Sequence, residues 1–306
     1  ANSAEIILMC AGFPDDHEIF VPLANRLANE GGYLVGVTCL PGFDDREDFP
    51  YTRHKKEGYT FGEMVASMRE ATKAVRSEST YSDGKGGQAK LTGIYHDWGV
   101  IPGLILTNRC IQEKNDMLSP DRVVLFDVLG PPHPSRLKDM PEVPNKTYYE
   151  LIVTWTYRVI LAIAFSIRLY ISKILALIFA GFSFAILGLL RLSATYDIDS
   201  KVIQSRRHPI KFDRLIYMAY PYAAMFRGRI EDFSLPKDLV KTSLLYMYGT
   251  EKRIMFHDKR ALLVLEREER KGRMSKAIAV EDAGHWLFMQ QPDICFEEVV
   301  KFIRDA

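Results

Sequence analysis

Short runs of β-branched and aliphatic residues alternate along the chain with longer amphipathic stretches. This alternation is typical of a parallel sheet covered by helices. The short runs predict six strands, at residues 5–10, 33–39, 89–95, 122–128, 242–248 and 276–281. Residues 62–78 and 291–304 place apolar side chains three and four positions apart, which predicts a helix with one buried face in each stretch. We therefore expect an α/β fold with a mainly parallel sheet of six strands.

The alternation stops after the fourth predicted strand. Residues 130–144, GPPHPSRLKDMPEVP, contain five prolines, and the fixed φ and missing N–H of proline rule out a continuous helix there. The sheet pattern returns only at Thr242. We expect three parts: residues 1–133 as the first part of the core, 134–232 as an inserted helical lid, and 233–306 as the second part of the core.

The inserted segment is strongly apolar. No acidic residue occurs from Leu151 to Tyr196, and residues 174–190 are seventeen uncharged positions in a row, close to the minimum length that spans a bilayer. A helix of this kind can pack against the core, but basic residues around it also suit an anionic membrane interface. We favour lipid contact through Leu151–Leu192, either spanning the bilayer or lying on one side of it.

Composition narrows the range of functions. The 306 residues carry 40 Lys and Arg against 39 Asp and Glu, a net charge of +1, so no broad positive field favours nucleic acid as a partner. The four cysteines lie far apart and form no metal-ligand pattern with histidine. We expect reduced, mostly buried thiols, no metal and no cofactor. The first residues lack the pattern of a secretory signal, which favours an intracellular, membrane-associated protein.

Three segments place reactive groups where predicted strands end. In AKLTGIYHDWG, residues 89–99, a strand runs into a turn and an apolar helix, which would hold Asp97 on a nucleophile elbow. The start of the helix stabilises an ionised carboxylate, although an Asp there also serves as an ordinary cap. His285, in EDAGHW, follows the last predicted strand and is either structural or catalytic. Residues 12–20, GFPDDHEIF, offer backbone amides for an oxyanion hole.

In chain order, GFP, HDWG and GHW resemble motifs of the α/β-hydrolase superfamily, and within it the branch of epoxide hydrolases and haloalkane dehalogenases. The resemblance covers the whole chain. It implies that Asp97 attacks an electrophilic carbon and forms an ester, and that His285 activates the water that hydrolyses this ester. It also implies that the main-chain amides of Phe13 and Trp98 hold the oxyanion. Dehalogenases commonly have an Asn at the position of Phe13, so the epoxide hydrolases are favoured.

The acid that orients the histidine has two candidates. The family commonly places it in a G-x-x-D pattern after the fifth strand, whereas this chain has Gly249, Thr250, Glu251 and Lys252 there. Some dehalogenase-type members instead take the acid from the end of the preceding core strand, which is Asp127 here. We favour Asp127 and keep Glu251 as the alternative.

The resemblance also concerns the lid and the elbow. Epoxide hydrolases use two lid tyrosines that donate protons to the epoxide oxygen. The matching positions are Tyr148 or Tyr149 early in the lid, and Tyr220 or Tyr222 late in it. At the elbow, Tyr95 replaces a small residue of the family, so its ring is expected either to strain the turn or to fill the substrate pocket.

Two functions follow from these features. The first is an epoxide hydrolase-like enzyme that acts on an apolar substrate drawn from a membrane. The second is a catalytically inactive hydrolase fold that serves as a scaffold or subunit of a membrane protein assembly, which the altered elbow and the long apolar insertion favour. An open pocket with Asp97 and His285 within hydrogen-bond reach distinguishes the enzyme from the scaffold.

Overall fold

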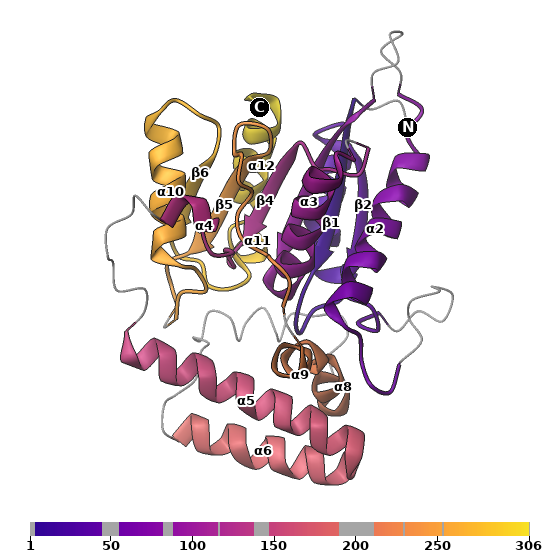
Figure 1. Ribbon diagram of the computed structural model, residues 1–306, viewed down its shortest axis with the longest axis vertical. Helices are drawn as coiled ribbons and strands as arrows, with labels where there is room; N and C mark the ends of the chain where they lie inside the picture. The colour runs from indigo at the N-terminus through magenta and orange to yellow at the C-terminus, as the bar shows by residue number, and fades with distance from the viewer. Residues whose placement is uncertain are drawn as a thin grey trace.

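A parallel sheet of six strands forms the centre of the molecule (Figure 1). The computed structural model describes residues 4–44, 55–81, 88–115, 117–137, 147–189, 211–228, 230–252 and 254–305. The strands are β1 (Glu5–Ala11), β2 (Leu34–Cys39), β3 (Lys90–His96), β4 (Arg122–Phe126), β5 (Ser243–Gly249) and β6 (Lys276–Val280). They lie in the order β2-β1-β3-β4-β5-β6, and every pairing is parallel. The six predicted strands are confirmed, each within two residues of its expected bounds.

Helices cover both faces of this sheet. The main ones are α1 (Val21–Asn29), α2 (Phe61–Ser77), α3 (Val100–Glu113), α10 (Lys259–Arg270) and α12 (Pro292–Asp305), with the short α11 (Leu287–Gln290) before the last. On β1, Leu8 packs with Val75 of α2. The neighbouring Ile7 points to the opposite face, because strand side chains alternate, and joins the cluster that contains Leu27 of α1. The core also holds all four cysteines as buried free thiols.

An insertion between β4 and β5 forms a separate layer at the carboxyl edge of the sheet (Figure 1). After the short α4 (Pro134–Leu137), the helices among its described residues are α5 (Tyr148–Tyr170), α6 (Lys173–Leu189), α8 (Phe212–Met218) and α9 (Tyr220–Arg227). We call these last four the inserted helices. A capping box starts α5: the Thr147 hydroxyl accepts the Glu150 N–H at 3.2 Å, and the Glu150 carboxylate accepts the Thr147 N–H at 2.8 Å.

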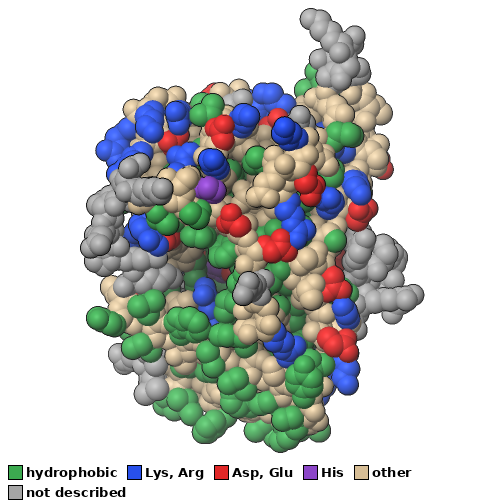
Figure 2. All heavy atoms as spheres, viewed as in Figure 1, with side chains coloured by type: hydrophobic (Ala, Val, Ile, Leu, Met, Phe, Trp, Pro, Cys, Tyr) green, Lys and Arg blue, Asp and Glu red, His purple; other side chains and the backbone are tan. Residues whose placement is uncertain are grey.

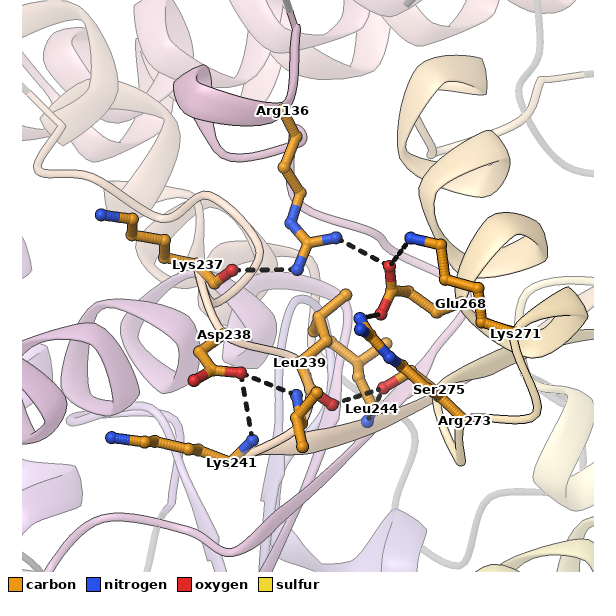
Figure 3. Close-up of polar contacts among 11 residues, drawn as sticks. Arg136, Lys237, Asp238, Leu239, Lys241, Leu244, Glu268, Lys271, Arg273 and Ser275 are labelled. Atoms are coloured by element: carbon orange, nitrogen blue, oxygen red, sulfur yellow. Dashed lines mark hydrogen bonds and ion pairs between the residues drawn. The ribbon is translucent and has the colours of Figure 1, made fainter. Parts of the chain in front are cut away.

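Arg136 joins the two ends of the insertion, and a buried glutamate holds its guanidinium (Figure 3). Glu268 of α10 is 1 % exposed and accepts hydrogen bonds from Arg136 of α4 at 3.1 Å and from Lys271 and Arg273. The Arg136 guanidinium also donates to the carbonyl oxygen of Lys237 at 2.9 Å. Because Arg136 precedes the inserted helices and Lys237 follows them, the chain leaves the core and returns to it at one place.

Tyr95 is accommodated by two glycines. Its side chain is 1 % exposed and lies between β3 and α3. A Cβ added to Gly93 would lie 2.3 Å from the phenol oxygen, and one added to Gly103 would lie 2.5 Å from the ring. The missing side chains of these glycines therefore create the space that the large ring occupies between sheet and helix.

This packing predicts the effect of a single methyl group. We expect Gly103→Ala to lower the free energy of unfolding by about 1–3 kcal/mol, the range for overpacked cores, because the new Cβ would overlap the Tyr95 ring. Urea unfolding measures this loss. Gly188→Ala on α6, where nothing lies within 4 Å of the added Cβ, is the control and should cost nothing. Adding Tyr95→Ala to Gly103→Ala should cost less than the sum of the two single changes; strict additivity would contradict the contact.

Candidate active site

Asp97 lies at the turn between β3 and α3, at the carboxyl edge of the sheet. Its φ of 49° is in the left-handed region that few residues other than glycine adopt. Two glycines let the end of β1 approach this turn. A Cβ added to Gly99 would lie 2.5 Å from the carbonyl oxygen of Cys10, and one added to Gly12 would lie 2.2 Å from the Trp98 nitrogen. The result is the sharp strand-turn-helix geometry of a nucleophile elbow.

His285 lies between two carboxylates. Its Nδ1 is 2.6 Å from Asp127 Oδ2, and its Nε2 is 3.5 Å from Asp97 Oδ2. The other carboxylate oxygen of Asp127 pairs with the ammonium group of Lys252, whose side chain is 1 % exposed. The four side chains thus form a buried row in the order Lys252, Asp127, His285 and Asp97.

The two carboxylates keep His285 protonated. Burial alone would lower the pKa of His285, but the hydrogen bonds and charges of Asp127 and Asp97 outweigh burial and raise the pKa from 6.5 to about 10. Burial alone would raise the pKa of Asp127, but the charge of Lys252 and then the hydrogen bond from His285 lower it to about 2. At neutral pH, His285 therefore carries a positive charge and Asp127 a negative one.

The contact to His285 comes from Asp127, at the end of β4, where its N–H donates to the carbonyl oxygen of Met247 at 2.8 Å. Glu251, the alternative acid, is an exposed residue of the loop after β5 and takes no part in this contact. Lys252 occupies the last position of the G-x-x-D pattern and contacts the same carboxylate. A lysine thus stands where the motif would place the acid.

A second histidine, which the sequence reasoning missed, holds the His285 loop. His96 is fully buried, and its Nε2 lies 3.1 Å from the His285 carbonyl oxygen. Burial lowers the pKa of His96 well below its usual value, so the ring is neutral and its single proton is on Nε2, since a carbonyl oxygen only accepts. Nearby, Trp286 Nε1 donates to Asp15 Oδ2 at 2.8 Å. These contacts join the segments after β1, β3 and β6.

The segment that carries Phe13 runs past the elbow, because Gly12, the residue before Phe13, has no Cβ that would overlap the Trp98 nitrogen. Within the described part of the chain, Asp97 Oδ1 is buried and has no hydrogen-bond partner. This oxygen is therefore held in the elbow as an unsatisfied acceptor, which is costly for a merely structural carboxylate.

Two tyrosines of the inserted helices lie near Asp97. Tyr222 of α9 packs its ring on Trp98, with centroids 4.7 Å apart. Tyr157 of α5 packs against Tyr222, with centroids 5.9 Å apart, and lines the same cavity as Asp97 and Arg158. Burial raises the pKa of both phenols, so both are protonated at neutral pH and can donate.

The other tyrosines expected from the motif lie elsewhere. Tyr148 is 88 % and Tyr149 41 % exposed at the start of α5, two turns before Tyr157. The Tyr220 hydroxyl donates to the carbonyl oxygen of Pro41 at 2.8 Å. The expectations for Tyr148, Tyr149 and Tyr220 are therefore corrected, and the early tyrosine near Asp97 is Tyr157.

A cavity of about 270 Å³ opens beside Asp97. Helix α5 contributes Tyr157 and Arg158 to its wall. Most other lining side chains are apolar: Trp98, Val100, Ile101, Val128, Leu129, Pro131, Met225, Ile230, Phe233 and Phe256. Tyr95 is not part of the described lining, so it does not fill this pocket. The carboxylate thus faces a mainly apolar space, with polar groups from α5 and, at His257 and Asp258, from the segment before α10.

Known structures share this architecture. An epoxide hydrolase of the α/β-hydrolase superfamily from metagenomes of hot environments gives a TM-score of 0.59 at 13 % identity, with 99 % of this chain and 92 % of that chain covered. The Bacillus megaterium epoxide hydrolase in complex with an inhibitor gives 0.56 at 15 %, over 99 % and 94 %. MenH from S. aureus gives 0.54 at 12 %, over 100 % and 95 %. No protein-family model and no curated protein matches the sequence. This similarity shows that the chain has the α/β-hydrolase fold, as its motifs imply.

The protonated His285 should be visible in stability measurements. Because its folded-state pKa lies above the usual 6.5, its protonation stabilises the folded protein fully below about pH 6.5, and this contribution is lost as the pH rises towards 10. We expect the difference in melting temperature between the wild type and His285→Gln to be largest near pH 6.5 and to shrink as the pH rises towards 10. A difference that stays constant or grows with pH would contradict a raised pKa.

Proposed function

We propose that this chain is an epoxide hydrolase-like enzyme, in which Asp97 opens the ring of an apolar epoxide and His285 hydrolyses the resulting ester. One observation carries the proposal: Asp97 Oδ2 and His285 Nε2 lie 3.5 Å apart beside a mainly apolar cavity of about 270 Å³. The contact of His285 with Asp127 supports the third role, that of the orienting acid.

In the first step, a carboxylate oxygen of Asp97 bonds to a ring carbon, and the bond from that carbon to the epoxide oxygen breaks. The oxygen needs a proton. Tyr157 lines the same cavity as Asp97, and burial raises the pKa of its phenol, so the phenol is protonated. Tyr157 therefore gives its proton to the epoxide oxygen and becomes a tyrosinate.

In the second step, His285 changes role because Asp97 has changed charge. Once Asp97 is an ester, it no longer helps to raise the pKa of His285. His285 then gives its proton to the tyrosinate that formed in the first step. The neutral imidazole then takes a proton from water, and the hydroxide attacks the ester carbonyl. The amides of Phe13 and Trp98 stabilise the oxyanion. When the intermediate collapses, the bond between its carbon and the substrate oxygen breaks and this oxygen takes the proton of the added hydroxyl. The diol is released with Asp97 ionised and His285 protonated.

The other candidate from the sequence is an inactive scaffold. It rests on the altered elbow and on the missing Asp of the G-x-x-D pattern after β5. The packing of Tyr95 between two glycines and the contact of Asp127 with His285 give each of these features a structural explanation compatible with catalysis. We therefore favour the enzyme. The scaffold would be the conclusion if Asp97 forms no ester with any epoxide.

The two reactive residues should fail at different steps. With a panel of apolar epoxides, His285→Gln should form the Asp97 ester and accumulate it, whereas Asp97→Ala should form none. Mass spectrometry of the peptide that contains Asp97 reads the added mass directly. Asp258→Ala, which removes another carboxylate at the cavity wall, is the control and should leave ester formation intact. Absence of the ester in both wild type and His285→Gln would overturn the proposed chemistry.

The proton donors can be tested on one helix. We expect Tyr157→Phe to slow ester formation by about 10²–10⁴-fold, the contribution of a general acid, since it removes the phenol beside the cavity. Tyr149→Phe makes the same chemical change on the same helix at a 41 % exposed position and should leave the rate unchanged. Single-turnover kinetics of ester formation compares the two. Equal rates for both variants would exclude Tyr157 as a donor.

A further inference from the structure

The inserted helices expose an apolar face. Fourteen of the twenty large apolar side chains that are exposed among the described residues lie between Tyr148 and Leu189. On α6 they are Ile174, Leu175, Ile178, Phe182, Ile186 and Leu189. Figure 2 shows these side chains gathered over α5 and α6, whereas charged groups are spread over the core. A patch on this scale indicates an interaction surface, and we call it the hairpin face.

The other side of α5 belongs to the core. Val153 and Phe165 are at most 1 % exposed, and Tyr157 and Arg158 line the cavity. Helix α5 is long and apolar enough to cross a membrane, but crossing would remove these side chains from the fold. With 17 residues, α6 is about 25 Å long, less than a hydrocarbon core of about 30 Å. The pair of helices α5 and α6, which we call the hairpin, can therefore enter a membrane from one side only.

The chemistry of the hairpin face suits a lipid interface. Its aliphatic centre is flanked by amphipathic rings, with Trp155 54 % exposed near the start of α5 and Tyr170 72 % exposed at its end. One basic group lies at the end of α5: the Arg227 guanidinium is 5.3 Å from the centre of the Tyr170 ring. Aromatic rings and lysine or arginine at the edge of an apolar surface are typical of membrane-interface helices.

Not every basic residue of the segment contributes. Arg158 lines the cavity, and Arg168 stacks 4.9 Å from the centre of the Tyr217 ring. Lys173 is 2.5 Å from the Asp213 carboxylate. Electrostatic attraction is therefore modest, and apolar contact has to supply most of the binding.

A mainly apolar groove lies beside the hairpin face. It measures about 280 Å³ and lies between α5 and α9. Its wall combines Val159, Ala162, Ile163, Ala223 and Phe226 with the polar pair Ser166 and Arg227, which are hydrogen-bonded at 3.1 Å. An apolar slot with a cation matches a lipid tail and its anionic headgroup.

We propose that the hairpin face docks on the interface of a bilayer that contains anionic lipid, without spanning it. Helix α5 then contacts lipid on one side and lines the cavity on the other, so an epoxide dissolved in the membrane would reach Asp97 through the inserted helices. Membrane binding itself does not depend on the proposed catalysis.

Vesicle flotation tests the docking. The full chain should float with vesicles of phosphatidylcholine and phosphatidylglycerol, and less with phosphatidylcholine alone. Ile178→Glu combined with Phe182→Glu should weaken vesicle binding at least about tenfold. Each change puts a charge in place of an apolar side chain whose burial in the bilayer stabilises the bound state. Val240→Glu, at a 62 % exposed apolar position outside the hairpin, is the matched control and should bind like the wild type. Circular dichroism checks that each variant is folded.

A second readout uses Trp155, because Trp98 and Trp286 are buried. Vesicles with brominated acyl chains should quench the fluorescence of the wild type, and Trp155→Phe should lose this quenching. Asp97→Asn should still float and be quenched, which separates this proposal from the catalytic one. If the wild type does not float, or if the hairpin variant instead converts a dimer to a monomer in light scattering, the face contacts a second copy and the membrane proposal is wrong.

Discussion

The buried row of Lys252, Asp127, His285 and Asp97 is the interaction on which the rest of the structure depends. Buried charges are stable only when each meets an opposite charge at close range, and every member of this row comes from a different strand end. Asp97 follows β3, Asp127 follows β4, Lys252 follows β5 and His285 follows β6. A shift in the register of any of these strands would separate the charges, so sheet and site stabilise each other.

The lysine makes this row electrically balanced. If Asp127 faced only His285, its whole negative charge would act on the imidazole and hold the imidazole proton more tightly. Lys252 instead pairs with Asp127 and offsets part of that charge. The imidazole therefore depends on Asp97 for part of its affinity for the proton, and the proposed ester would remove that part. The arrangement links the charge of Asp97 to the protonation of His285.

The sequence predicted the parts of the structure that repeat or that follow a strand. The six strands were predicted from short runs of β-branched and aliphatic residues. Asp97 and His285 were singled out by their position after strands and Asp127 by the family resemblance, and the structure places all three at one edge of the sheet. Tyr157 was missed because no local pattern indicates which turn of α5 faces the cavity. The Tyr95 ring occupies the space left by Gly93 and Gly103. Only the packing of β3 against α3 shows that these glycines lie on the ring. The ion pair of Lys252 with Asp127 likewise joins residues that are far apart in the chain.

The ion-pair cluster of Glu268 and Arg136 has a consequence for how such a chain can diversify. The insertion departs and returns through one narrow neck, at Arg136 and Lys237. Its length and composition can therefore change without moving the strands that carry the charges. The neck makes the inserted helices an exchangeable module, free to acquire a new cellular address or a new ligand while the carboxyl edge of the sheet is inherited unchanged.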